Sequence, residues 1–474
     1  MLFYEPLFLF VFFPNFYLLY LFAERRYWLR GAVILLGSIV FYEWTEPFFA
    51  ALVLVSCVAD FLIARHIAKI PASSKQAKLF LALGIVINLA MLVHFKYTRF
   101  LLQNLNSLLA GLSVQPITVP SIALPVGVSF VVFEKITYLV DVQRRLSQPA
   151  RNFATYLTYV FFFPKLLAGP IIKYHEIESQ LASLPKANLN DFSVGFQRFM
   201  LGVVKKTLIA DTLASGADMV FGNSVGAVSF AEAWWGVIFF TFQIYFDFSA
   251  YSDMAIGIAR MLGFRLLENF NMPYISCSIT EFWRRWHISL STWIREYLYI
   301  PLGGNRVPPA RRYFNLWLCF FASGLWHGAS WTYVIWGAYN GVFLVLDKLF
   351  LLRFLEKLPR WQANAFTFFV TVVGWTLFRA GSLQQAEIFL SAMVRPWQTS
   401  SAQIFITNDI FAATALAAFC CVLPRLPRFD RLRTLFLEQR RWTLAMETAL
   451  ALLFICAVGK AVADPFKPFL YFRF

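Results

Sequence analysis

Charged residues are scarce in this sequence. Only 14% of the 474 residues are charged, whereas 59% are hydrophobic and 54 are phenylalanine. Soluble domains carry about a quarter charged residues, and one soluble core cannot hide this much apolar surface. The composition excludes an ordinary soluble protein and indicates that a bilayer surrounds much of the chain.

Cysteine and the common catalytic motifs are scarce too. The six cysteines are scattered except for Cys420 and Cys421, which predicts neither a disulfide framework nor a metal site. The sequence contains no His-Glu-x-x-His metal motif. We therefore expect no bound metal or cofactor, and chemistry carried by isolated polar side chains.

Long apolar runs recur along the chain and predict an all-α, polytopic membrane protein. Some runs are short and one is nearly twice the length of a crossing, so we expect roughly ten to twelve spans, several of them broken, re-entrant or tilted. The first run is followed by Glu24, Arg25 and Arg26 instead of a cleavage site, so it should remain as a span. The clearest runs are 7–22, 31–41, 47–64, 79–95, 153–172, 230–248, 314–350, 365–378, 404–423 and 444–458.

The formal net charge of +16 fits membrane topology better than nucleic-acid binding. Basic residues follow the first and third runs, whereas the loop between the second and third is acidic at Glu43 and Glu46. The positive-inside rule then places the first and third loops in the cytoplasm and the N-terminus outside. Six arginines within 425–441 predict another cytoplasmic loop, while Lys467 and Arg473 leave the orientation of the C-terminus open.

The domain organisation is predicted to be simple. No fixed-period repeat is visible, and no Pro/Ser/Gly-rich linker separates independent parts. We expect a single membrane domain over 1–474, with N-terminal spans in 1–112, a core in 113–350 and C-terminal spans in 351–474.

One stretch, 281–306, is too polar to span a membrane and too patterned to be a loop. At about 100° per residue, its tryptophans and His287 share one helical face and its arginines the other, with Ile288 as the misfit. The pattern predicts an amphipathic helix at the bilayer surface or capping a bundle, stopped near Pro301. His287 is then either a hydrogen-bonded core residue or a functional one.

The run 314–350 contains the sequence GLWHGASW around His327. The run is nearly twice the length of one crossing and is punctuated by glycines, so we expect a break inside it. Gly324 and Gly328 permit close backbone approach, which leaves room beside His327. Its neighbour Trp326 is a candidate for substrate binding, with packing as the alternative. Ionisable residues at membrane depth usually mark function, and a neutral imidazole can accept a proton from an incoming hydroxyl.

Other polar groups lie among aromatic residues and are candidates for substrate binding. Asp247 and Asp253 end an apolar run, and the alternative is that they only cap or pair. Arg284 and Arg295 are most simply surface cations, although a phosphate-bearing donor needs such a cluster near the cytoplasmic mouth. His175, in the segment 162–176, is expected to be interfacial.

The two histidine segments resemble the membrane-bound O-acyltransferase family, in its bacterial branch that acts in alginate O-acetylation. WRRWHISLSTWIREYLYIPLGGNR contains His287, and SGLWHGASWTYVIWG contains His327. Further likeness is found in LPVGVSFVVFEKITYLVDV, FFPKLLAGPIIKYHE, IYFDFSAYSDMAIGIARMLGF, GWTLFRAGSLQQAEIFL and the ending PFLYFRF. The likeness covers most of the chain.

The resemblance implies a bacterial inner-membrane enzyme built around a central funnel. The family's catalytic histidine corresponds to His327, and a second histidine near the donor corresponds to His287. An acetyl group from a cytoplasmic donor, acetyl-CoA, is expected to pass across the membrane. A periplasmic partner of the SGNH esterase type is expected to complete delivery to a polysaccharide that the export machinery carries. Two positions depart from the family pattern: Glu296 replaces a frequent Asp, and Asn340, a candidate for substrate binding, replaces a frequent His.

Three other functions stay open at this point. The D-alanine-exporting relatives of teichoic acid modification share the fold. A transporter or flippase would use the same polar groups to line a path without chemistry. A haem-binding cytochrome would use His287 and His327 as axial ligands.

Overall fold

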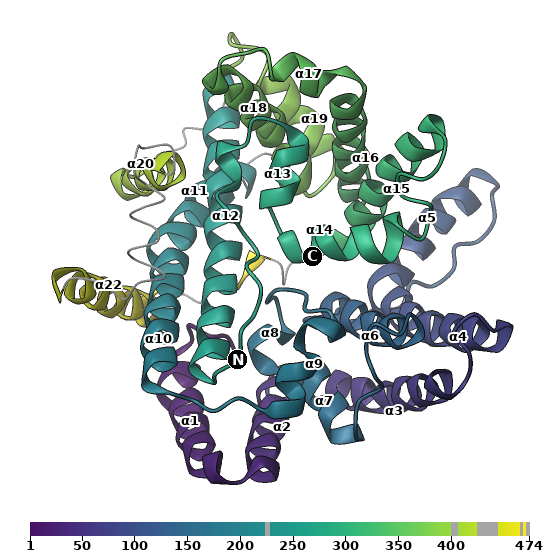
Figure 1. Ribbon diagram of the computed structural model, residues 1–474. Coiled ribbons are helices and arrows are strands. Elements are labelled where there is room, and N and C mark those ends of the chain that lie inside the picture. Colours follow the sequence, from purple (N-terminus) through teal and green to yellow (C-terminus); the bar gives the residue numbers. More distant parts are fainter. Residues whose placement is uncertain (223–227, 400–405, 424–443, 465–467, 471–474) are drawn as a thin grey trace. The chain divides into compact units, whose positions relative to one another are not determined.

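The computed structural model is helical throughout the regular parts that it describes (Figure 1). It describes residues 1–222, 228–399, 406–423, 444–464 and 468–470. The predicted all-α class is confirmed for these residues. The arginines within 425–441, Lys467 and Arg473 lie outside the described residues, so the topology signals read from them stay predictions.

Five helical stretches among the described residues are long and apolar enough to cross a membrane: Phe8–Arg25, Pro47–Lys69, Lys75–Gly111, Trp331–Leu355 and Leu444–Ala463. Large apolar side chains project from them, and Phe48, Leu79 and Ile455 are 94%, 69% and 65% exposed. Lipid contact explains such exposure, because apolar side chains on a spanning helix are solvated by acyl tails. The protein is thus a multi-pass membrane protein, whereas roughly ten to twelve spans stay a prediction.

The chain forms two compact units, which are described separately. Unit 1 comprises residues 1–195 and 255–267, and unit 2 comprises 196–254 and 268–474. The chain therefore leaves unit 1 within one helix, α10, and returns to it within another, α12. The expected single domain over 1–474 stays a prediction.

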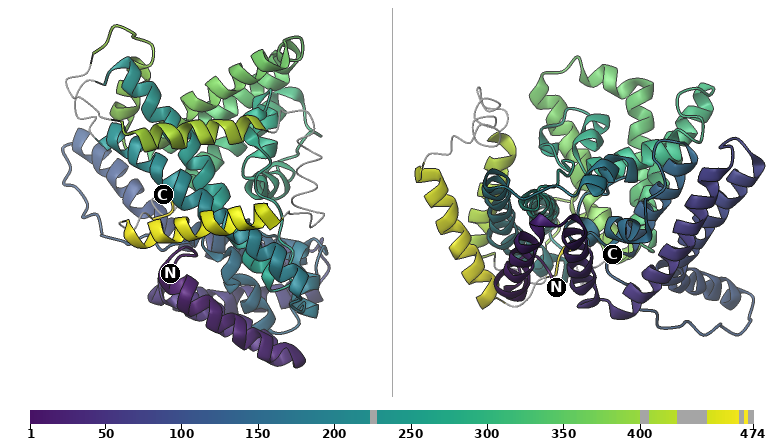
Figure 2. Two further views of the ribbon diagram at one scale, coloured as in Figure 1. Left: turned by 90° about the vertical axis from the view of Figure 1, so that its left-hand side faces the viewer. Right: turned by 60° about the horizontal axis from the view of Figure 1, so that its bottom comes forward.

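Unit 1 contains the N-terminal helices. Two of them, α3 and α4, lie side by side, and α6 packs against both (Figures 1 and 2). The elements are η1 (Phe8–Phe12), α1 (Phe13–Phe22), η2 (Ala23–Arg25), α2 (Tyr27–Glu43), α3 (Pro47–Lys69), α4 (Lys75–Leu92), η3 (Val93–Tyr97), α5 (Thr98–Gly111), α6 (Val128–Gln143), α7 (Phe153–Phe161), α8 (Phe163–Leu166), α9 (Tyr174–Ser183) and the start of α10 (Leu189–Val204). Since α6 is buried from Val128 to Val142, every charge on it needs a partner from a neighbouring element.

Unit 2 contains the helices that carry both histidine motifs. Its helices α20 and α22, yellow-green and yellow in Figure 2, both pack against η4. The elements are η4 (Lys205–Ala210), α11 (Asp211–Gly222), α12 (Phe230–Met261), η5 (Pro273–Ile275), α13 (Ile279–Arg285), α14 (Ile288–Ile294), η6 (Arg295–Tyr299), α15 (Pro309–His327), α16 (Trp331–Leu346), η7 (Asp347–Leu351), α17 (Leu352–Leu355), α18 (Arg360–Arg379), α19 (Leu383–Ala392), α20 (Asn408–Val422) and α22 (Leu444–Ala463).

The expected break in the run 314–350 is confirmed. Helix α15 ends at His327, Gly328 is extended with φ −166°, and α16 begins after Ser330, whose side chain accepts a hydrogen bond from the Thr332 amide. The two helices form a closely packed hairpin (Figure 1). A Cβ on Gly324 would come within 2.9 Å of the Gly337 Cα, so only glycine allows the two backbones to approach this closely.

The expected single helix over 281–306 is wrong. Helix α13 ends at Arg285, and α14 begins at Ile288. Between them His287 adopts the left-handed conformation, with φ 44° and ψ 56°, which is uncommon for a residue other than glycine. The turn re-aims the chain, which explains why Ile288 did not fit the helical pattern.

Candidate active site

The His287 ring lies in the interior of unit 2. Its residue is 1% exposed, and the ring of Phe248 meets it edge-on with centroids 4.7 Å apart. The backbone beside it is held by the Ile288 amide, which donates to the Asn269 carbonyl oxygen at 2.9 Å. Burial lowers the pKa of His287 to about 3, because the imidazolium loses its hydration there. The ring is neutral at physiological pH.

The His327 ring lies at the end of α15 among aromatic side chains. It is 4% exposed, and the Trp336 and Phe378 rings lie 5.1 and 5.3 Å from it, both edge-on. Because Gly328 follows directly, the helix stops at the imidazole and leaves the ring at the turn of the hairpin. Rigid helices and large rings thus fix its orientation.

Trp326 joins the two histidines. Its indole centroid is 5.0 Å from the His327 ring and 6.1 Å from the His287 ring. The side chain is 5% exposed. Trp326 therefore packs against both imidazoles, although His327 ends α15 and His287 lies in the turn between α13 and α14.

A cavity of about 380 Å³ brings the two histidines together. Arg284 and Arg295 are exposed, whereas His287 and His327 are buried, so the lining leads from the protein surface to the imidazoles. Arg295 also forms an ion pair with Glu296 at 2.8 Å. The lining residues are Thr280, Trp283, Arg284, His287, Ile288, Leu290, Ser291, Thr292, Ile294, Arg295, Phe320, Ser323, His327 and Leu344.

The two predicted aspartates lie in ion pairs elsewhere in unit 2. Asp247 pairs with Lys206 at 2.8 Å and accepts a hydrogen bond from the Leu470 amide at 2.8 Å. Asp253 pairs with Lys205 at 2.8 Å and with Arg198 at 3.0 Å. These contacts match the alternative that the aspartates pair, and their role in binding substrate stays a prediction.

Asn340 lies on α16, one helical turn after Trp336. Its side-chain amide donates to the Trp336 carbonyl oxygen at 2.9 Å, and it is 6% exposed. Because the Trp336 ring packs on His327, Asn340 touches the turn of α16 that carries this ring. A contact between Asn340 and substrate stays a prediction.

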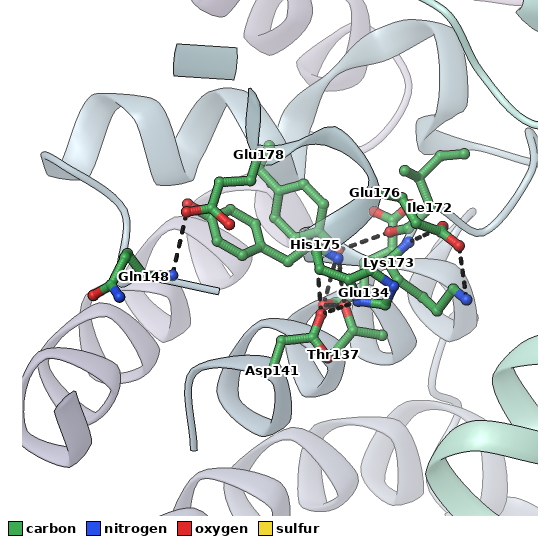
Figure 3. A network of polar contacts seen from close by, with 11 residues as sticks. Glu134, Thr137, Asp141, Gln148, Ile172, Lys173, His175, Glu176 and Glu178 are labelled. Atoms are coloured by element: carbon green, nitrogen blue, oxygen red, sulfur yellow. Dashed lines mark hydrogen bonds and ion pairs between the residues drawn. The ribbon is translucent and has the colours of Figure 1, made fainter. Parts of the chain in front are cut away.

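Unit 1 joins several polar residues of the segments 125–141 and 162–176 in one network, including Glu134, Asp141 and His175 (Figure 3). The His175 Nδ1 lies 2.9 Å from the Asp141 Oδ2, and Lys165 pairs with Glu134. Asp141 raises the pKa of His175 through this hydrogen bond, against the opposing effect of partial burial. The network joins α6 to α9 and to the segment before it.

Sequence reasoning missed several residues around the two histidines. Phe248, Trp336 and Phe378 form their walls, and Asn269 contacts the His287 ring. Aromatic residues are so frequent here that composition does not single out these three. Among the described residues there is no group of three or more His, Cys, Asp or Glu side chains arranged to hold a metal ion.

Comparison with known proteins points to one family. The model of the MBOAT, membrane-bound O-acyltransferase family, matches residues 140–383. The chain is 39% identical to the probable alginate O-acetylase of Pseudomonas putida over the full length of both, and 37% identical to that of Pseudomonas aeruginosa, again over both full lengths. It is 35% identical to the peptidoglycan O-acetyltransferase of Helicobacter pylori, over 83% of this chain and 80% of that protein. The teichoic acid D-alanyltransferase of Bacillus subtilis is 26% identical over 47% of this chain and 59% of that protein.

Proposed function

Because this chain belongs to the membrane-bound O-acyltransferase family, we propose that it is the membrane O-acetyltransferase for an exported polysaccharide such as alginate. The observation that carries the proposal is the cavity that His287 and His327 share, with two exposed arginines in its lining. The probable alginate O-acetylases, which align over the whole chain, support the substrate class.

The donor is acetyl-CoA, held by the two arginines. Its phosphate groups need cations at the entrance, and the exposed guanidinium groups of Arg284 and Arg295 supply planar, permanently charged donors. The apolar and aromatic lining deeper in the cavity suits the uncharged acetyl end. Trp326 keeps both imidazoles beside the reacting thioester.

The reaction at this site is direct acyl transfer. An acceptor hydroxyl attacks the thioester carbonyl while its proton passes to the neutral imidazole of His327. The new C–O bond forms, the C–S bond breaks, and the imidazolium returns the proton to the leaving thiolate. His287 is neutral at working pH, so it orients the donor as a hydrogen-bond acceptor and does not supply the proton.

The topology follows the charge pattern. The N-terminus lies on the periplasmic side of the inner membrane, and the roughly ten to twelve crossings include the two helices of the broken run 314–350. A periplasmic SGNH-type protein takes part in delivery to the polymer, beside the export machinery. In this arrangement the acetyl group enters from the cytoplasm and leaves on the opposite side.

Membrane vesicles that contain the protein test this proposal. Inverted vesicles that enclose the polymer and the periplasmic partner, supplied outside with acetyl-labelled acetyl-CoA, are expected to yield labelled ester, which mild alkali releases. Vesicles without the protein give the background. Transport of the polymer or of another solute without any labelled ester would contradict the proposal and favour a transporter. Label transfer only from a D-alanyl donor would favour the function of the teichoic acid relatives.

A further inference from the structure

Asn269 makes a dense set of contacts around His287. Its side-chain oxygen Oδ1 accepts from the Ser289 amide at 3.2 Å and from the Ser289 hydroxyl at 2.9 Å. The same oxygen lies 3.2 Å from the His287 Nδ1. The amide nitrogen Nδ2 donates to the Ser252 hydroxyl at 3.3 Å. Asn269 is 1% exposed, so water does not compete for these contacts.

These contacts decide which way the Asn269 amide points. A backbone N–H only donates, so the atom that faces the Ser289 amide is the oxygen of Asn269. That oxygen only accepts, and therefore the His287 nitrogen facing it, Nδ1, carries a proton. In the neutral ring the other nitrogen, Nε2, then holds the accepting lone pair.

Because His287 is buried, its ring keeps this single proton at physiological pH. The pKa of His287 is lowered to about 3, so the ring carries a single proton. The charged groups that share its cavity, Arg284 and Arg295, are both cations, so neither supplies a counter-charge that would favour a second proton on the ring.

We propose that Asn269 is a positioning residue that holds His287 in the Nδ1–H tautomer, so that Nε2 accepts a hydrogen bond from the donor substrate. The catalytic meaning of this inference rests on the proposed function. The left-handed turn at His287 belongs to the same arrangement, because it places the ring and Ser289 against one amide group.

The tautomer is measured first, without any reaction. Protein labelled with ¹⁵N-histidine in detergent is compared with His287→Gln, which identifies the His287 signals. The expected spectrum has a protonated Nδ1 and an unprotonated Nε2, and Asn269→Ala shifts the signals toward the opposite tautomer. A protonated Nε2 in the native protein, or an unchanged spectrum in Asn269→Ala, would overturn the inference even if the protein transfers acetyl groups.

The pH profile of transfer is the second measurement. Asn269→Asp keeps the size and the accepting oxygen but places a carboxylate against Nδ1, which stabilises the imidazolium and turns Nε2 into a donor. The acid limb of kcat/KM for acetyl-CoA is expected to move to higher pH, with about a tenfold loss at neutral pH, the upper range for one hydrogen bond. Asn271→Asp, two residues further along, adds the same charge at an exposed position and should keep the native profile. Matching profiles for the two variants would contradict the proposal, and absence of transfer by the native protein would instead contradict the proposed function.

Discussion

Two sets of buried ionisable groups, one in unit 1 and one in unit 2, have different surroundings. In unit 1, the side chains of Asp60, Glu134 and Asp141 lie against Lys135, Lys165 and His175 within hydrogen-bonding distance. In unit 2, the rings of His287 and His327 are walled by aromatic side chains and line a cavity. Both arrangements place ionisable residues in apolar surroundings. The difference shows that burial alone does not mark a catalytic group, since a charge matched by its neighbour holds helices together.

Breaking the Glu134–Lys165 pair is expected to have the largest effect on stability. Glu134→Gln leaves the buried Lys165 ammonium without its counter-charge and is expected to cost about 3–5 kcal/mol in free energy of unfolding. The double variant Glu134→Gln, Lys165→Met removes both charges and should recover most of the loss. Thermal unfolding in detergent measures both variants. A double variant as unstable as the single one would contradict a role based on charge matching.

The pairing in unit 1 was not predictable from the sequence. Glu134 and Lys165 belong to motifs separated by a helix, and no local pattern shows that α6 and the segment after α7 bring them together. The break at Gly328 was predictable, because the run 314–350 is too long for one crossing and contains glycines. The hydrophobic periodicity wrongly predicted one helix through His287, because it assumes helical dihedral angles at every residue. The left-handed conformation of His287 ends one helix and changes the direction of the next.

Which predicted residues lie together in the cavity was predictable only in part. The motifs identified His287 and His327 through the resemblance, but their convergence on one cavity depends on how α13, α14 and the α15–α16 hairpin pack. Arg284 and Arg295 were named for their charge and lie in the same lining. Asp247 was named as a polar group at the end of an apolar run and lies in an ion pair, because its partner Lys206 comes from η4.

Replacing an arginine of the unit 2 cavity tests whether this cavity binds the donor. Arg284→Ala is expected to raise the KM for acetyl-CoA by about tenfold, the effect of losing one charge-assisted hydrogen bond, with a smaller change in kcat. Arg311→Ala is the matched control, since this exposed arginine lies over the Phe314 ring at 5.4 Å. Steady-state transfer in vesicles gives both constants. Equal KM values for the two variants would remove Arg284 from donor binding.

The smallest effect is expected at His175. The folded pKa of His175 is raised by Asp141, so the protonated ring stabilises the fold. This contribution is complete below the unfolded value near 6.5 and is lost as the pH rises through the folded pKa. The stability difference between the native protein and His175→Gln should therefore be under about 1 kcal/mol and should shrink at alkaline pH. A difference that grows with pH would contradict the assigned pairing.

The most direct test of the account compares two histidines in one assay. His327→Ala and His175→Ala are produced at equal membrane levels in cells that export the polymer, and the ester content of the polymer is measured. The account predicts that His327→Ala loses at least about a hundredfold, the contribution of a general base, while His175→Ala retains native acetylation. Retained acetylation in His327→Ala, or equal losses in both variants, would contradict the claim that the cavity of unit 2 is the place of the chemistry.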